Sequence, residues 1–240
     1  QIEENKKKQQ IEKNNDQSSD APSVNFEDKK VPNISRDYKA RTINKSVNRS
    51  LALKFGKEYF DGSREQGYGG YKYDGRWIKV AKKLIKIFNL KNGSKFLDVG
   101  CAKGYLMFDL YNENKLIDIH GIDISSYAKD NSPEIIKPKI KIGDCKKLNF
   151  ENNYFDCVVA INTVHNLEYD DCKKTISEIQ RISGGNAFIQ VDAYRNDEEL
   201  SIFKDWMLTA KTYLKPDEWK KLFNEVGYTG YYFWTILEKM

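Results

Sequence analysis

The order of apolar and polar positions predicts strands that alternate with helices from residue 76 onward. Short apolar runs bounded by glycine or polar residues are typical of buried strands. They lie within five stretches, 95–99, 116–125, 140–145, 154–161 and 186–194. Apolar residues at helical spacing predict helices within five others, 76–90, 105–110, 168–184, 196–210 and 215–228. This alternation implies a parallel sheet that is covered on both faces.

A tight glycine turn is predicted between the first strand and the helix that follows it. The turn contains Gly100 and Gly104, which let the backbone bend sharply and let a ligand approach it, and the helix start offers unpaired N–H groups. A dinucleotide-binding fingerprint would need glycines at positions 102 and 105, where Ala102 and Tyr105 stand. The turn therefore favours a nucleotide-type ligand other than NAD.

The sequence DVGCAKG, residues 98–104, resembles the first motif of the class I S-adenosylmethionine-dependent methyltransferases. In that family an acidic residue near the end of the first strand precedes a GxGxG-like turn, and here alanine takes the place of the middle glycine. The resemblance covers about residues 76–240 and implies S-adenosyl-L-methionine as cofactor. It implies a Rossmann-like fold with a mostly parallel seven-stranded sheet, helices on both faces and an antiparallel C-terminal strand.

Later stretches fall in the order that this family would require. Asp123 ends the second predicted strand, where a carboxylate can accept hydrogen bonds from ribose hydroxyls, although the same placement would suit NAD. The family usually contacts adenine after the third strand and places the floor of the acceptor site after the fourth. The resulting cofactor-binding candidates are Asp98, Gly100, Cys101, Gly104, Asp123, Ile124, Asp144, Cys145 and Asn162.

Three regions are predicted along the chain. Residues 1–35 are rich in polar side chains and bury too little surface to offset chain entropy, so we expect a disordered or loosely attached tail. Residues 36–75 are expected to form a helix followed by an aromatic and glycine-rich lid, and residues 76–240 the S-adenosylmethionine-binding domain. The tail 229–240 is rich in β-forming residues and is the expected antiparallel strand.

The stretch 59–77, YFDGSREQGYGGYKYDGRW, mixes large rings with glycines. It is either a loop pinned to the domain by its aromatic residues or a lid over cofactor and acceptor. In a lid, the rings would exclude water and could face a sulfonium cation, and an arginine could hold a carboxylate. The acceptor-binding candidates, with those after the fourth and fifth strands, are Tyr68, Tyr71, Tyr73, Arg76, Trp77, His165, Tyr194 and Arg195.

In methyl transfer, the protein contributes mainly by aligning the reactants and excluding water, and sometimes by supplying a base. His165 is the candidate base, because it lies just past the fourth strand and histidine titrates near neutral pH. A histidine that hydrogen-bonds locally is the alternative. Tyr194 and Arg195 follow the fifth strand at the same sheet edge, where parallel sheets bind ligands.

Composition and charge limit the kinds of partner that the protein is expected to bind. The net charge is only +5, and the sequence shows no concentrated basic stretch, which argues against a nucleic-acid acceptor. The four cysteines lack metal-ligand spacing, so we expect reduced thiols and no metal. The sequence holds no apolar run of about eighteen residues and no apolar signal core, so we expect a cytoplasmic protein without a membrane segment.

The expected activity is therefore methyl transfer to a small molecule. Arg64, Arg76 and Arg195 favour a polar or anionic acceptor, such as a carboxylate, a phosphate or a sugar-like compound. Two alternatives remain: a non-catalytic scaffold with the S-adenosylmethionine-binding fold, and an NAD-dependent enzyme if the C-terminal strand is misassigned. The sequence specifies neither the acceptor nor the oligomeric state.

Overall fold

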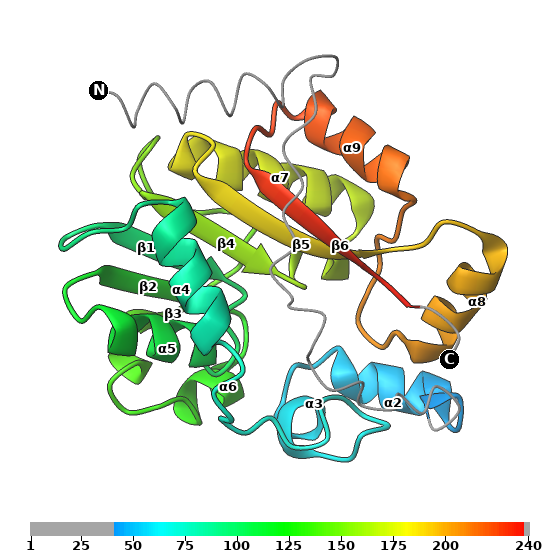
Figure 1. Cartoon of the computed structure of the whole chain (residues 1–240). Helices are drawn as coiled ribbons and strands as arrows, with labels where there is room; N and C mark the ends of the chain where they lie inside the picture. The colour runs from blue at the N-terminus through cyan, green and yellow to red at the C-terminus, as the bar shows by residue number, and fades with distance from the viewer. Residues whose placement is uncertain (1–40, 238–240) are drawn as a thin grey trace.

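The computed structural model describes residues 41–237, and these form one sheet in the order β3-β2-β1-β4-β5-β6 (Figure 1). Its strands are β1 (Lys95–Val99), β2 (Asp118–Asp123), β3 (Ile140–Ile142), β4 (Cys157–Ile161), β5 (Ala187–Ala193) and β6 (Tyr231–Ile236). Every neighbouring pair is parallel, which confirms the predicted α/β class. After β1 the chain builds β2 and β3 on one side and then crosses to β4 on the other. The point between β1 and β4 is therefore the topological switch at which such sheets bind ligands.

The expected seventh strand and the expected antiparallel direction of the last strand are both corrected. The sheet of the described residues has six strands, and β6 lies parallel to β5, with Phe188 opposite Tyr231 and Ala193 opposite Ile236. The connection from β5 to β6 contains two helices, α8 (Asp197–Trp206) and α9 (Pro216–Glu225). Such a crossover returns the chain in its original direction, whereas an antiparallel neighbour is usually joined by a hairpin.

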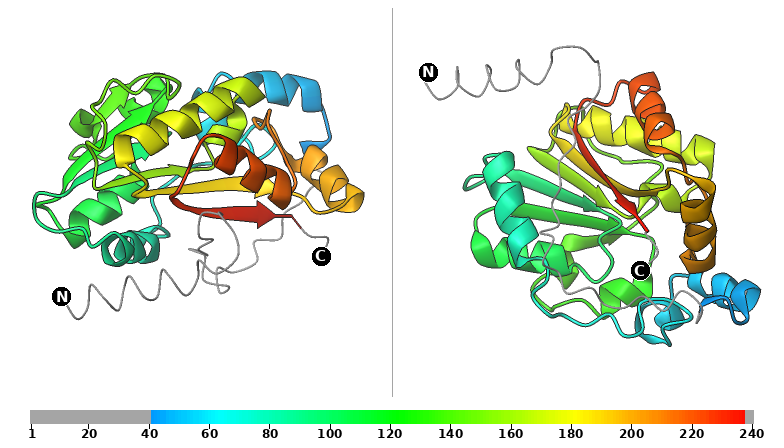
Figure 2. Two further views of the ribbon diagram at one scale, coloured as in Figure 1. Left: turned by 90° about the horizontal axis from the view of Figure 1, so that it is seen from above. Right: turned by 45° about the vertical axis from the view of Figure 1, so that its right-hand side comes forward.

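The remaining helices cover the two faces of the sheet or precede it. They are α2 (Lys45–Ala52), α3 (Lys57–Asp61), α4 (Ile78–Ile87), α5 (Tyr105–Glu113), α6 (Ser126–Asp130) and α7 (Tyr169–Ser183). One core lies between the sheet and α7 with α9, and the other between the sheet and α4 with α5. Figure 2 shows these helices on opposite sides of the strands.

Successive residues of each central strand pack alternately into the two cores. In β1, Phe96 packs on the α4 and α5 side while Leu97 packs on the α7 side, and in β4 Val158 and Val159 divide in the same way. Because both faces are covered, apolar residues stand at consecutive positions of these strands rather than at alternate ones, and Asp98 in β1 is a buried exception. The cores hold the carboxyl ends of β1, β2 and β4 in fixed register.

The region before α4 differs from the single helix that we expected. Two short helices, α2 and α3, are separated at Phe55, which has a left-handed φ of +49°, and Gly56. Both lie beyond the carboxyl ends of the strands, and α2 lies beside α8 (Figure 1). The Arg49 guanidinium donates to the Ala210 carbonyl at 3.0 Å, which ties α2 to the residues after α8. The expected tail, residues 1–35, lies outside the described residues, and the division between residues 36–75 and 76–240 stays a prediction.

Candidate functional site

The turn from Gly100 to Gly104 has the compact backbone that its small residues predicted. Gly100, Ala102 and Gly104 have positive φ values of 77°, 50° and 69°. A Cβ on Gly100 would lie 2.2 Å from the Thr163 hydroxyl oxygen, so the loop after β4 closes directly over the turn. The Gly100 N–H donates to the Ile122 carbonyl at 2.7 Å, which fixes the turn against β2.

Asp123, at the end of β2, supports the turn from the other side. One carboxylate oxygen accepts the Ala102 N–H at 2.7 Å, and the second accepts the Ser125 N–H at 2.8 Å. Burial raises the pKa of this carboxyl, and the backbone N–H groups oppose the rise because they stabilise the charged form. Asp123 therefore holds the turn in shape and keeps lone pairs that can accept ribose hydroxyls.

Asp98, in β1, is the second buried carboxylate of the site and lies in a different environment. It is 5% exposed, and no hydrogen bond reaches its carboxylate from the residues that the structure describes. Burial, together with the charge of Asp123, raises its pKa to about 8. A buried acid without a partner is unfavourable when ionised, and a bound cation would compensate it. This observation fits the positively charged amino-acid moiety of S-adenosylmethionine.

Ile124, next to Asp123, offers an apolar surface at the same edge. It is 62% exposed, and Ile142, the register partner of Asp123 on β3, is also exposed. Exposed isoleucines beside a carboxylate fit a heterocycle whose ribose binds that carboxylate. The site residues fit S-adenosylmethionine in this respect too.

The other cofactor candidates lie in the turn or in the loops that follow β3 and β4. Cys101 is buried within the turn, and Cys145 is half-buried, with its pKa raised to about 11 by burial. Asp144 is exposed and forms an ion pair with Lys146 at 3.3 Å. Asn162 directly follows β4 and has a left-handed φ of +54°, a conformation that asparagine adopts more readily than most other non-glycine residues.

The aromatic segment, residues 59–77, packs directly on the glycine turn. Phe60, Tyr71 and Tyr105 form one buried cluster, and the ring centroids of Tyr71 and Tyr105 are 5.0 Å apart. Burial raises the pKa of Tyr71, and the Asp98 charge contributes to the rise. The neighbouring Tyr59 and burial raise the pKa of Tyr68, and the charge of Asp123 makes a smaller contribution. Tyrosines of the segment thus lie near both buried carboxylates.

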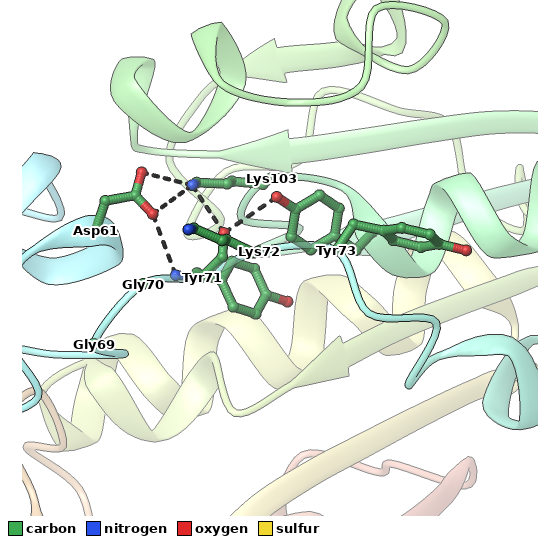
Figure 3. Close-up of a pocket in the computed structure, with 8 residues that line it drawn as sticks. Asp61, Gly69, Gly70, Tyr71, Lys72, Tyr73 and Lys103 are labelled. Carbon is green, nitrogen blue, oxygen red and sulfur yellow. Dashed lines mark hydrogen bonds and ion pairs between the residues drawn. The ribbon is translucent and has the colours of Figure 1, made fainter.

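An open cavity of about 530 Å³ lies where the segment meets the turn (Figure 3). Its polar and aromatic lining comes from Asp61, Tyr71, Lys72, Tyr73, Lys103 and Tyr105. The Lys103 ammonium lies 2.7 Å from both carboxylate oxygens of Asp61 and 2.9 Å from the Tyr71 carbonyl. Sequence reasoning missed Lys103 and Asp61 as site residues. A lysine inside a turn of small residues was the available signal.

The acceptor candidates of the aromatic segment are bonded within the chain. The Tyr73 hydroxyl donates to Asp109 at 2.5 Å, and the Trp77 indole N–H donates to the Tyr71 hydroxyl at 3.3 Å. Arg76 forms an ion pair with Asp74 at 2.6 Å. The segment is therefore held by its own polar contacts as well as by its rings.

Two further arginines that we considered for an anion are also engaged. Arg64 donates to the Tyr68 carbonyl at 2.9 Å, and Arg195, after β5, donates to Glu199 at 2.8 Å. Tyr194 is half-buried beside Arg195, and burial raises its pKa. An anionic acceptor would have to compete with these internal partners.

His165 lies in the 3-10 turn after β4 and is 4% exposed. Its Nδ1 accepts the Asp192 N–H at 3.0 Å, so the proton of the neutral ring is on Nε2. That nitrogen is 3.8 Å from the Asp192 carboxylate. Burial lowers the pKa of the imidazole, and the Asp192 charge opposes this. A ring in this state has no unused lone pair, so the geometry favours local hydrogen bonding over the role of base.

Two features are absent from the part of the chain that the structure describes. No group of three or more His, Cys, Asp and Glu side chains within residues 41–237 could hold a metal ion. No helix in this part of the chain is both long enough and apolar enough to cross a membrane.

Comparison with known proteins identifies the domain. Residues 97–189 match the family model described as a methyltransferase domain. This part of the chain therefore belongs to a methyltransferase domain. This match confirms the family that the DVGCAKG motif suggested, and it runs from within β1 to within β5 and includes the turn and both buried carboxylates.

Known relatives of this methyltransferase domain share only part of the chain. The chain is 29% identical to phosphoethanolamine N-methyltransferase 3 of Arabidopsis thaliana over 96 residues, which are 38% of its length. The match spans only 19% of that relative's length.

Solved structures of low identity share the fold. A chain of the Haloferax volcanii complex between the Trm112 methyltransferase activator and its methyltransferase partner is 18% identical, with a TM-score of 0.52 over 80% of this chain and 76% of that one. The [4+2]-cyclase SpnF is 16% identical, with a TM-score of 0.53 over 86% and 73%. One of the two is named for another reaction, so the fold by itself does not specify methyl transfer.

Proposed function

We propose that this protein transfers a methyl group from S-adenosylmethionine to a small polar molecule. The observation that carries the proposal is the pair of buried carboxylates, Asp98 and Asp123, on either side of the glycine turn at the topological switch of the sheet. One is bonded to the turn, and the other has no hydrogen-bond partner among residues 41–237 and is suited to a cation. The match to a methyltransferase domain supports the same conclusion.

Each cofactor residue has a defined task in this proposal. Asp98 would pair with the positive charge of the amino-acid moiety, Asp123 would accept ribose hydroxyls, and Ile124 would pack against adenine. When bound, S-adenosylmethionine supplies an activated methyl group on a sulfonium that is already a good leaving group. The protein must then align the acceptor and exclude water. Tyr68 and Tyr71 of the aromatic segment would provide that exclusion and present their ring faces to positive charge.

We further propose an amine acceptor that carries a phosphate group as the first class to test. The support is the name of the Arabidopsis relatives, together with the absence of an evident base at His165, since a neutral amine needs none. A phosphate would have to recruit Arg64, Arg76 or Arg195 from their internal partners. The acceptor half of the proposal is therefore separable from the cofactor half.

Isothermal titration calorimetry tests the cofactor half. S-adenosylmethionine, S-adenosylhomocysteine and NAD are titrated in parallel, and we expect micromolar binding of the first two and none of NAD. Binding of NAD alone would refute the proposal in favour of a nicotinamide enzyme. If none of the three compounds binds, the non-catalytic scaffold is favoured, because its fold needs no functional cofactor site.

Methyl transfer from labelled S-adenosylmethionine tests the acceptor half. Phosphoethanolamine is compared with ethanolamine, which lacks the phosphate, and with β-alanine, which carries a carboxylate at the end of the molecule where phosphoethanolamine carries its phosphate. Turnover of phosphoethanolamine well above that of the other two supports the proposed class. Equal turnover of ethanolamine would remove the phosphate from recognition, and no turnover of any compound despite cofactor binding would exclude this acceptor class.

A further inference from the structure

Lys103 lies inside the glycine turn, yet all three bonds of its ammonium leave the turn. The side chain is 4% exposed, and its donors reach both oxygens of Asp61 and the carbonyl of Tyr71 (Figure 3). An ammonium has three donors, so none is left over. A buried lysine in this position is satisfied only while the aromatic segment lies on the turn.

Asp61 gathers contacts from three parts of the molecule. Besides Lys103 from the turn, it accepts the Tyr127 hydroxyl of α6 at 2.7 Å and the Tyr71 N–H of the aromatic segment at 3.2 Å. Partial burial raises the pKa of Asp61, but the bonds from Lys103 and Tyr127 outweigh this and leave the pKa below its usual value. Asp61 is thus a charged acceptor, and it keeps all three partners only while the aromatic segment lies against the turn and α6.

The backbone of the turn is fixed from two sides by two carboxylates. Asp123 binds the N–H of Ala102, and Asp61 binds the side chain of the next residue, Lys103. Both Ala102 and Gly104 have left-handed backbone angles, so this short stretch has little freedom to adjust separately. A change at Asp61 is therefore transmitted to the backbone that would face the cofactor.

We infer that Lys103 and Asp61 are positioning residues whose ion pair couples cofactor binding to closure of the aromatic segment. The inference rests on the proposed function, because it requires a cofactor in the turn. A cofactor that orders the turn favours the Lys103 position that Asp61 needs, and closure of the segment favours the turn that the cofactor needs. By linkage, each event strengthens the other by the same factor.

A double-mutant cycle tests the coupling through the dissociation constant of S-adenosylhomocysteine. We expect Asp61→Asn and Lys103→Met each to weaken binding about tenfold, and the double variant to bind no more weakly than the worse single variant, because one interaction is lost in each case. Tyr127→Phe removes one bond to Asp61 and leaves the ion pair, so it should give a smaller effect. It also keeps the test available if a single charge variant folds poorly.

Trypsin supplies a readout that a merely structural role would not change. The aromatic segment carries exposed cleavage sites at Arg64, Lys72 and Arg76. We expect S-adenosylhomocysteine to slow cleavage there at least several-fold in the wild type, and to give little protection in Asp61→Asn at ligand concentrations that saturate the variant. Lys86→Met and Asp130→Asn, which change exposed residues on α4 and α6, are the matched controls and should keep full protection.

The outcomes separate this inference from the proposed function. Wild-type protein that binds no S-adenosylhomocysteine would refute the proposed function and the coupling with it. Wild-type binding with full ligand protection in Asp61→Asn would overturn the coupling alone. The coupling would also be overturned if the dissociation constant of the double variant rose by the product of the two single factors, because the two side chains would then act independently.

Discussion

Removing the charge of Asp98 should stabilise the protein at alkaline pH while it weakens cofactor binding. The carboxyl is buried, and its pKa is raised from 3.8 to about 8. The titratable groups around it are the Asp123 carboxyl, the Tyr71 hydroxyl and the thiols of Cys101 and Cys157, and none of them is a cation. Asp98→Asn keeps the size of the side chain and removes the charge.

The sign follows from proton linkage. Between pH 4 and 8 the folded protein keeps a proton on Asp98 that the unfolded chain has released, so stability falls as the pH rises through this window. A shift of about four pKa units corresponds to about 6 kcal/mol as an upper limit. Relaxation and water entry reduce the penalty for a buried ion, and we expect about 2 kcal/mol. For a domain of this size that is about 4 to 8 °C in Tm.

Thermal melts of wild type and Asp98→Asn at pH 4.5, 6.5 and 8.5 measure this directly. The difference in Tm should be small at pH 4.5, where Asp98 is protonated when folded, and should grow to its full value at pH 8.5. Asp130→Asn is the control, because it makes the same chemical change at an exposed carboxylate at the end of α6. The same Asp98→Asn protein should bind S-adenosylmethionine at least tenfold more weakly, a factor equivalent to about 1.4 kcal/mol.

A pH-independent difference in Tm would refute the reasoning, since it would mean that Asp98 titrates alike in folded and unfolded protein. A loss of stability at pH 8.5 would refute it more strongly, because it would show a favourable partner for the ionised carboxylate. Gain of stability with unchanged cofactor affinity would leave the electrostatic argument intact and remove Asp98 from the cofactor site.

Three other changes test single residues of the site. Asp123→Ala should weaken S-adenosylhomocysteine binding by about 1 to 3 kcal/mol, because buried ribose donors lose their acceptor, and unchanged affinity by calorimetry would remove Asp123 from the site. Gly100→Ala should lower Tm, since its φ is +77° and its Cβ would lie 2.2 Å from the Thr163 hydroxyl; a wild-type Tm would contradict this geometry. His165→Asn should keep turnover within about threefold, because an amide oxygen can still accept the Asp192 N–H, whereas a hundredfold fall at unchanged cofactor affinity would make His165 the base.

Local sequence signals were sufficient for most elements of the fold. The helix before β5 ends at Ser183 because Gly184 adopts a left-handed φ of +58°, and α9 begins at Pro216, whose fixed φ suits a first helical position. Composition also predicted a strand near the C-terminus. It could not specify the direction of β6, which depends on the connection through α8 and α9 rather than on the residues of the strand.

The candidate site divides in the same way. Asp98, Gly100 and Asp123 could be predicted because each occupies a fixed place relative to a strand end. Lys103 and Asp61 are 42 residues apart and meet only in the folded chain, so no local pattern pairs them. The sequence also could not show that His165 is buried. Its burial and the hydrogen bond from the Asp192 N–H favour local hydrogen bonding over the expected role of base.

The two electrostatic features of the site are physically connected, and this gives a last prediction. Tyr71 of the aromatic segment lies close enough to Asp98 for the carboxylate to raise its pKa, so closure of the segment contributes to the burial of Asp98. Releasing the segment by Asp61→Asn should admit water to Asp98 and lower its pKa toward the ordinary value. The gain in Tm from Asp98→Asn at pH 8.5 should therefore shrink in the Asp61→Asn background.

Thermal melts of wild type, the two single variants and the double variant at pH 8.5 measure this coupling, with Asp130→Asn in place of Asp61→Asn as the control background. An undiminished gain in the Asp61→Asn background would show that the sheet and the turn alone bury Asp98. Closure of the aromatic segment would then have no electrostatic influence on the carboxylate. A reduced gain would mean that the aromatic segment, when it lies on the turn, contributes to the burial of the Asp98 carboxylate.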